Sequence, residues 1–188
     1  MTVLDFTQYL AGPFRTILLA DMGPDAVKIE KPNGGADTRR TGPPFISGES
    51  AAFLAVNRNK RSLVLDLKSP DGVQVAQRIA KKADVLVQNM RRGTIDRLGL
   101  GYEALREVSP DLIYLSGSTL GVNGPDYQAT GWGPNTLSYG GLISLTGYEG
   151  DAPVQAGGNL PDYLIGTVMG FHVLSALSHR RRTGEGQY

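Results

Sequence analysis

The sequence has 188 residues, enough for one domain with a substantial core. Its 19 basic and 18 acidic side chains leave a net charge of +1, which argues against a general nucleic-acid-binding protein. Without cysteine there is neither a disulfide framework nor a thiolate metal site, and we expect a protein of a reducing, cytoplasmic compartment. No apolar run approaches the roughly 20 residues of a membrane helix, and the N-terminus lacks a secretory pattern, so we expect no membrane contact.

Strand and helix patterns alternate along the chain. The predicted strands are residues 3–6, 25–30, 62–67, 84–89 and 111–118. The predicted helices are residues 11–23, 69–83, 101–110 and a long last helix from Asp162 to about Arg182, and residues 31–47 and 121–161 are predicted as long loops. This alternation predicts an α/β fold with a Rossmann-like parallel sheet covered by helices on both faces. The last residues, "GEGQY", read as the start of another strand, so we expect a longer protein.

The common nucleotide and metal signatures are missing. Glu30 ends the second strand, where an acid could meet a ribose, but the first loop, "QYLAGPFR", has one glycine where a dinucleotide fold needs three. A G-x-G-x-x-A spacing at residues 99–104 follows no strand, and there is no P-loop. His172 and His179 share one face of the last helix without an acidic cluster, so we interpret them as packing residues and expect no metal site.

Asp162 has two interpretations. As a structural residue it is a good N-cap for the apolar helix that follows, which we predict to be a core helix. As a reactive residue it follows a loop, "GGNLP", whose glycines leave room for a ligand. The N–H groups of a helix N-terminus would also favour an anionic intermediate.

Basic residues recur in the loops that follow predicted strands. Each alone is an ordinary solvated side chain, but several at successive strand ends could surround a polyphosphate at the carboxyl edge of the sheet. These residues are Lys31, Arg39, Arg40, Arg58, Lys60, Arg61, Lys68, Arg91, Arg92 and Arg97.

Five blocks in order carry a resemblance to a known family. They are "VLDFTQYLAGPFRTILLADMGPDAVKIEKP", "NRNKRSLVLDLKSPDG", "ADVLVQNMRRGTIDRLGLGYEAL", "GPDYQATG" and "PDYLIGTVMGFHVLSALSHRRRTGEGQ". The sequence resembles the class III CoA-transferases, the family of formyl-CoA transferase, carnitine CoA-transferase and α-methylacyl-CoA racemase. The resemblance covers essentially the whole chain. It implies that residues 1–188 are the N-terminal part of the large, CoA-binding Rossmann-like domain, without the second small domain and the C-terminal return.

The resemblance also implies an activity. Asp162 aligns with the aspartate that attacks an acyl-CoA thioester, giving a mixed anhydride and then an aspartyl-CoA thioester, which a second carboxylate resolves. The expected substrates are acyl-CoA and a small carboxylic acid, with coenzyme A as substrate and no permanently bound cofactor. The expected assembly is an interlocked homodimer.

Coenzyme A contacts carry over position by position. Leu10 and Ala11 belong to the first loop, near the expected adenosine end. Thr130, Gly131, Trp132 and Gly133 are expected near the pantetheine and the thioester. The remaining expected contacts lie at or after strand ends: Lys31, Leu65, Asp66, Leu67, Lys68, Asn89, Met90, Arg91 and Arg97.

Two departures from the family pattern matter. Leu10 stands where formyl-CoA transferase has a glutamine, which disfavours formyl or oxalyl specificity. Trp132 stands where the racemase branch has a catalytic histidine, and tryptophan cannot shuttle a proton. This favours a transferase over the alternative of an α-methylacyl-CoA racemase or epimerase. A third alternative is a CoA-binding or dimer-scaffold segment without turnover.

Overall fold

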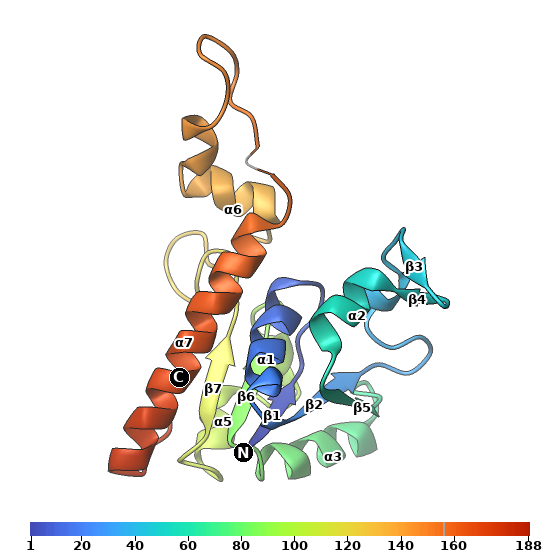
Figure 1. Cartoon of the computed structure of the whole chain (residues 1–188). Helices are drawn as coiled ribbons and strands as arrows, with labels where there is room; N and C mark the ends of the chain where they lie inside the picture. The colour runs from blue at the N-terminus through green and yellow to red at the C-terminus, as the bar shows by residue number, and fades with distance from the viewer. Residues whose placement is uncertain (156) are drawn as a thin grey trace.

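The computed structural model describes residues 1–155 and 157–188, and at its centre lies a five-stranded, all-parallel sheet (Figure 1). Its strands are β1 (Thr2–Asp5), β2 (Asp25–Glu30), β5 (Lys60–Val64), β6 (Val85–Gln88) and β7 (Ile113–Ser116). Their order is β5-β2-β1-β6-β7, so the chain reverses its direction of winding between β1 and β6. The predicted α/β fold class is confirmed, and the reversal creates a switch point where such sheets bind ligands.

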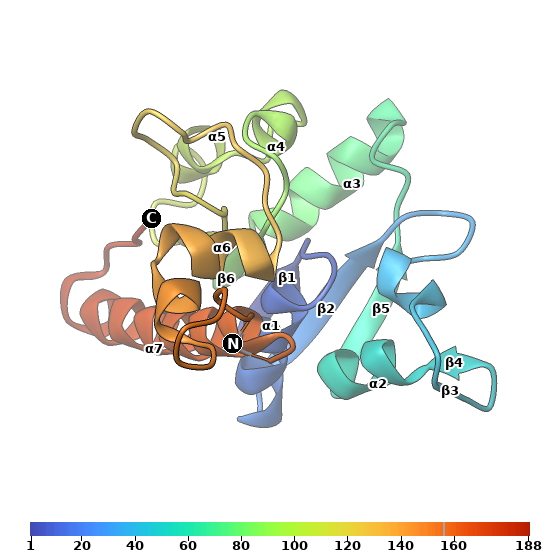
Figure 2. The same cartoon turned by 90° about the horizontal axis from the view of Figure 1, so that it is seen from above.

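Helices cover both faces of this sheet (Figure 2). On one face lie α1 (Ala11–Asp21) and α7 (Leu160–Thr183), and on the other lie α3 (Pro70–Ala80), α4 (Thr94–Arg97) and α5 (Tyr102–Arg106). Successive strand residues point to opposite faces, so Val3 joins the cluster under α1 and α7 while Leu4 joins the cluster under α3 and α5. Both side chains are fully buried.

Several short elements escaped the sequence analysis. They are the 3₁₀ turn η1 (Asp37–Arg40), the hairpin β3 (Phe45–Ile46) and β4 (Glu49–Ser50), α2 (Ala51–Asn57), α4, α6 (Gly133–Tyr139) and the 3₁₀ turn η2 (Leu142–Leu145). The missed helices have four to seven residues, at most two turns, too short for a helical period to stand out. Of these elements, α6 matters most here because it borders Asp162.

The end of the chain lies beside β7. Gln187 forms a single parallel bridge with Ile113, and the N–H of Tyr114 donates to the Gln187 carbonyl at 2.8 Å. The ring of Tyr188 stacks on that of Tyr102, with centroids 4.9 Å apart. The strand tendency predicted for "GEGQY" is therefore confirmed as one bridge.

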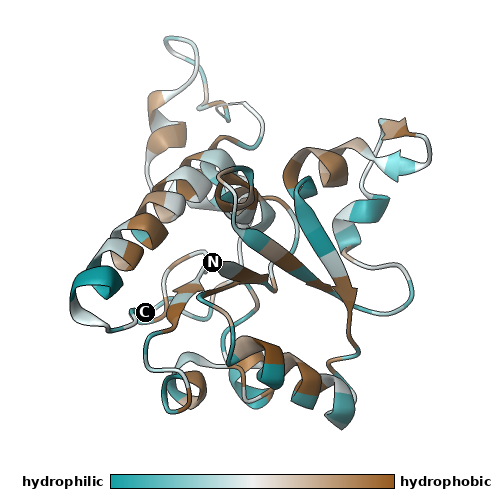
Figure 3. Cartoon of the chain, turned by 60° about the horizontal axis from the view of Figure 1, so that its bottom comes forward, coloured by the Kyte–Doolittle hydropathy of each residue, from teal (hydrophilic) through white to brown (hydrophobic). Residues whose placement is uncertain are grey.

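Helix α7 departs from the expected core helix. Gly166, Gly170 and Val173 are its buried residues, whereas the Leu164 side chain is 55% exposed and that of Phe171 is 68% exposed. Figure 3 shows hydrophobic residues recurring along the helix. By length and composition α7 is also long and apolar enough to cross a membrane, because an 18-residue window within it has a mean hydropathy of 1.3. The expectation that no apolar run approaches the length of a membrane helix is therefore wrong. Interspersed Gly, Ser and His hid the run, and in the structure α7 packs along α1.

Candidate functional site

The first loop, residues 6–10, is fixed to the switch point by Asn89. The N–H of Gln8 donates to Asn89 Oδ1 at 2.8 Å, and Asn89 Nδ2 donates to the Gln8 carbonyl at 2.9 Å. Both ends of the Asn89 amide are therefore used to hold the loop between β1 and α1. The predicted coenzyme A contact of Asn89 stays a prediction, and what its side chain does in this structure is brace the loop.

Asp162 is the third residue of α7, not its N-cap. The helix begins at Leu160 and Asn159 occupies the N-cap position. The Asp162 N–H donates to the Asn159 carbonyl at 3.1 Å. The prediction that the helix starts at Asp162 was wrong by two residues, because Leu160 and Pro161 already form its first turn. The N-cap interpretation of this carboxylate fails with it.

The N-termini of α1 and α7 converge at Asp162. Gly166, one turn further along α7, lies so close to α1 that a Cβ there would stand 2.6 Å from Phe14 Cδ1. Burial raises the pKa of the half-buried Asp162 carboxyl, while the N–H groups of Ala11 and of Asp162 itself, together with Arg15, act to lower it. The carboxylate has thus lost part of its water and stands beside N–H groups of two helix N-termini.

The "TGWG" segment, residues 130–133, lies against Asp162 and the first loop. A Cβ on Gly133, the first residue of α6, would stand 3.2 Å from Pro161 Cγ and 3.5 Å from Asp162 Oδ2. The ring of Trp132 meets that of Tyr9 edge to face, with centroids 5.1 Å apart, and is 65% exposed. The structure therefore brings Trp132 and Gly133 to the first loop and to Asp162. Sequence reasoning did not identify Tyr9.

For the CoA transfer that the family resemblance implies, we expect Gly133→Ala to reduce the rate about tenfold while leaving the thermal unfolding temperature nearly unchanged. The added methyl group would push Pro161, the residue before Asp162, by a few tenths of an ångström, and small displacements of a reacting group are costly for rate. Steady-state transfer rates and thermal melts of the complete protein test this. The matched control is Gly170→Ala, two turns further along α7, whose Cβ would meet Leu18 Cδ1 at an ordinary 3.8 Å. An equal loss of transfer in both variants would contradict the expectation.

The predicted phosphate contacts at the carboxyl edge fall into two groups. Lys68 follows β5 and Arg91 follows β6, both exposed, and these strands are three spacings apart, roughly 14 Å. They cannot share one phosphate, but an extended ligand could reach both. Lys31 is exposed and forms an ion pair with Asp37, and Arg97 is exposed on α4. Three other predicted contacts turn their side chains toward the core under α3 and α5: Leu65, Leu67 and Met90.

The remaining basic residues do not gather at this edge. Strand β5 starts at Lys60, two residues earlier than predicted, so the segment Arg58–Arg61 lies at the amino edge. There Arg61 pairs with Asp25 at the start of β2. Arg39 binds Glu30 through two hydrogen bonds of 2.8 Å, which occupies the acid that a ribose would have needed. The prediction of one basic ring around a polyphosphate is corrected accordingly.

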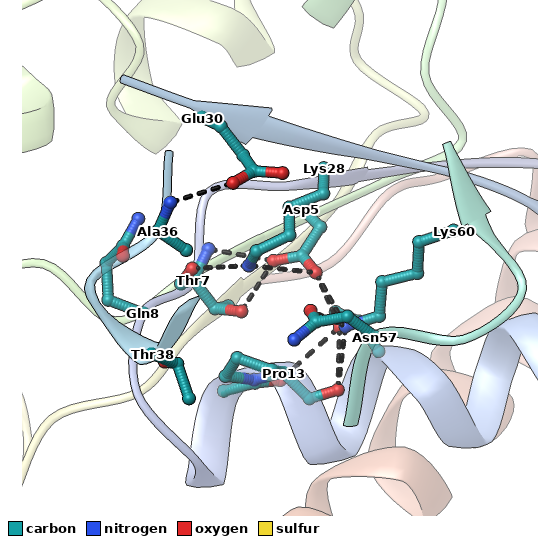
Figure 4. Close-up of polar contacts among 12 residues, drawn as sticks. Asp5, Thr7, Gln8, Pro13, Lys28, Glu30, Ala36, Thr38, Asn57 and Lys60 are labelled. Atoms are coloured by element: carbon teal, nitrogen blue, oxygen red, sulfur yellow. Dashed lines mark hydrogen bonds and ion pairs between the residues drawn. The ribbon is translucent and has the colours of Figure 1, made fainter. Parts of the chain in front are cut away.

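A buried ionic network lies beneath the first loop (Figure 4). Asp5 is fully buried and accepts hydrogen bonds from the Thr7 N–H at 2.8 Å, from Thr16 Oγ1 at 2.7 Å and from Lys60 Nζ at 3.0 Å. Lys28 Nζ stands 3.8 Å from the same carboxylate. Burial alone would raise the pKa of Asp5, but the two lysines and two threonines hold it well below its usual range.

The two lysines tie this network to the loop and to α1. Lys28 Nζ donates to the Thr7 carbonyl at 2.8 Å, and Lys60 Nζ donates to the Pro13 carbonyl at 2.9 Å. Burial lowers the pKa of Lys60 to about 8, with Asp5 opposing the effect. Sequence reasoning missed this framework, although charged residues at inward positions of "VLDF" and "AVKIE" were a signal for it.

The fold is a doubly wound α/β domain, a class of protein that binds its ligands at the switch point of the sheet. The chain belongs to CoA-transferase family III, whose family model matches residues 1–188.

Individual relatives agree with this assignment. The chain is 39% identical over 186 residues to the succinyl-CoA:glutarate CoA-transferase of Mus musculus, covering 99% of this chain and 43% of the relative. It is 40% identical over 202 residues to the succinyl-CoA:mesaconate CoA-transferase of Haloarcula hispanica, covering 100% and 49%. The crystal structure of a CAIB/BAIF family protein from Brucella suis superposes with a TM-score of 0.95 at 37% identity, covering 100% of this chain and 50% of that one. The chain thus spans about half the length of the relatives it matches.

Proposed function

We propose that the complete protein is an acyl-CoA:carboxylate CoA-transferase and that Asp162 is its nucleophile. The observation that carries the proposal is the position of the Asp162 carboxylate, half-buried where the N-termini of α1 and α7 meet, beside the N–H groups of Ala11 and of Asp162 itself. Family membership and relatives named as CoA-transferases support the reaction class.

The proposed chemistry is a series of acyl exchanges that balance without water. An Asp162 oxygen attacks the thioester carbonyl, the C–S bond breaks, and its electron pair leaves with the CoA thiolate. The thiolate then attacks the Asp162 carbonyl of the anhydride and releases the donor carboxylate, leaving an aspartyl-CoA thioester. The acceptor carboxylate displaces the thiolate from it, and the thiolate finally attacks the acceptor's acyl carbon and regenerates the Asp162 carboxylate.

No step of this cycle transfers a proton. An aromatic residue is therefore acceptable at position 132, where a racemase would need an acid or base. Partial removal of water makes the Asp162 carboxylate a better nucleophile, and the helix N-termini favour the negative charge that moves through the site.

We extend the proposal to the substrates and the assembly. Succinyl, glutarate, mesaconate and malate in the relatives' names are short dicarboxylic acids, so this acid class is our first choice for donor and acceptor. One relative is named for acetyl-CoA and oxalate, and Leu10 disfavours oxalate here. Exposed Lys68, Arg91 and Arg97 along the carboxyl edge are the proposed contacts for the phosphates of coenzyme A. We also propose an interlocked homodimer, as the family resemblance implies.

The test uses the complete protein with a panel of acyl-CoA donors and dicarboxylic acids, with new thioesters detected by mass spectrometry. Hydroxylamine added during turnover should modify Asp162 in proportion to trapped acyl-enzyme. Normal turnover with an unmodified Asp162 would contradict its role. Deuterium entering the α-carbon of an acyl-CoA without an acceptor acid would favour the racemase alternative, and CoA binding without transfer would favour a scaffold.

A further inference from the structure

Arg15, on α1, is a buried cation with an unused hydrogen-bond donor. Its side chain is 3% exposed, and its Nε donates to the Ala11 carbonyl at 3.1 Å. Its Nη1 has no hydrogen-bond partner within residues 1–155 and 157–188. Gly117, which follows β7, provides the space, because a Cβ there would stand 2.2 Å from Nη1. The guanidinium of Arg15 therefore occupies space at the end of β7 that is available only because residue 117 is glycine.

The arrangement is unfavourable for stability alone. Burying a charged group costs free energy unless it is paired and hydrogen-bonded, and a donor without a partner carries the full cost of its lost water. Apolar residues of similar volume often replace buried ionic groups without loss of stability. A buried, incompletely bonded cation beside a candidate nucleophile is thus better explained by the site than by the fold.

Two carboxylates act on Arg15 from opposite sides. Burial lowers the pKa of Arg15 to about 10, while Asp5 and Asp162 oppose that effect, so it stays charged at neutral pH. Neither carboxylate lies within 4.0 Å of the guanidinium as an ion pair. Asp5 is already occupied by Lys28 and Lys60.

Asp162 has no comparable second cation. Arg15 is the only charged side chain that acts on its pKa among the described residues. Of the elements around it, α6 and β7 carry no acidic or basic side chains, and α1 contributes Arg15 and the Ala11 N–H.

We propose that Arg15 is a positioning residue that keeps Asp162 ionised for its attack on the thioester, an inference that rests on the proposed function. The charge of Arg15, the fifth residue of α1, acts on the Asp162 carboxylate through space, and its side chain does not contact the substrate. When Asp162 is acylated, its negative charge reappears on the departing thiolate sulfur, close to the same cation. The field that prepares the nucleophile therefore also favours the leaving group.

The test compares Arg15→Gln, Arg15→Met and Arg15→Lys in the complete protein. Single-turnover acylation rates are measured from pH 5 to pH 9, and the Asp162 carboxyl is titrated by ¹³C NMR, assigned with Asp162→Asn. In Arg15→Gln and Arg15→Met the Asp162 titration should move to higher pH. Acylation should then fall about three- to tenfold more at pH 5 than at pH 8. Arg15→Lys, which keeps the charge, should restore most of the pH profile.

An unshifted Asp162 titration in Arg15→Gln and Arg15→Met would overturn the inference, as would a rate loss equal at every pH. The NMR titration needs no turnover, so it separates this inference from the proposed function. If the unsubstituted protein forms no acyl-enzyme, the proposed function fails whatever the titration shows. Thermal melts should show Arg15→Met folded and at least as stable as the unsubstituted protein, so that both measurements can be made.

Discussion

Asp162→Asn is expected to reduce CoA transfer at least a thousandfold, because an amide cannot form the anhydride on which every later step depends. The same variant should be as stable as the unsubstituted protein at pH 7, or slightly more stable. The folded-state pKa of Asp162 is raised above its usual value by burial, so the ionised form destabilises the fold at pH above that range. Replacing the carboxylate by an amide removes this destabilisation. The stability difference between Asp162→Asn and the unsubstituted protein should vanish as the pH falls below about 4, where Asp162 is protonated in both the folded and the unfolded protein.

The stability measurement separates two roles for this residue. If Asp162 capped α7, the asparagine change would alter capping and the alanine change would cost about 1 kcal/mol. Urea unfolding and transfer assays of Asp162→Asn and Asp162→Ala distinguish a capping role from a catalytic role. Glu103→Gln is the control, an exposed acid in the first turn of α5 that should change neither quantity appreciably. Transfer persisting in Asp162→Asn above a hundredth of the original rate would remove Asp162 from the mechanism.

Asp5→Asn should have the largest effect on stability, about 3–5 kcal/mol in the free energy of unfolding. The change leaves Lys28 and Lys60 buried without their shared anion, the costly way to break a buried ion pair. The pKa of Asp5 is held below its usual range, so its contribution is complete above about pH 4 and is lost as the pH falls through the folded-state value. The difference in the free energy of unfolding between Asp5→Asn and the unsubstituted protein should therefore become smaller at acidic pH.

A matched ion pair on the same sheet provides the control for Asp5. Asp25 pairs with Arg61 at an exposed position, so Asp25→Asn should cost at most about 1 kcal/mol. Chemical unfolding of both variants at pH 7 and pH 3 makes the comparison. Equal costs at pH 7 would mean that the buried network contributes no more than a surface ion pair.

The sequence predicted the elements with long periodic patterns and missed those decided by tertiary contacts. Strand β2 and the interior of α7 were recognised, because apolar positions recur over six or more residues. Helix α2 was not, because seven residues show too little of a period and its start depends on Ser50, whose Oγ accepts the Phe53 N–H. Strand β5 begins two residues early because Lys60 is drawn into the sheet by Asp5, a contact between residues 55 apart.

The candidate site shows the same division. Asp162 and the "TGWG" segment were identified by resemblance, and the structure places Gly133 against the Asp162 carboxylate. Arg15 and Asn89 act through geometry that no local pattern reveals. Asn89 was assigned to coenzyme A by the family resemblance, and only the coordinates show its amide bonded to Gln8. Exposure of α7 was likewise invisible to an amphipathic pattern, which cannot say how much of a helix is covered.

The pairing of α1 with α7 has a consequence for how the protein is made. The loops at the switch point come from the first 120 residues, whereas the candidate nucleophile arrives only with α7, about 150 residues after α1 begins. During synthesis the loops at the switch point can therefore form before the Asp162 carboxylate stands beside them. Docking of α7 on α1 is the step that brings this carboxylate to the switch point, so the candidate site within these residues is assembled by that one helix–helix contact.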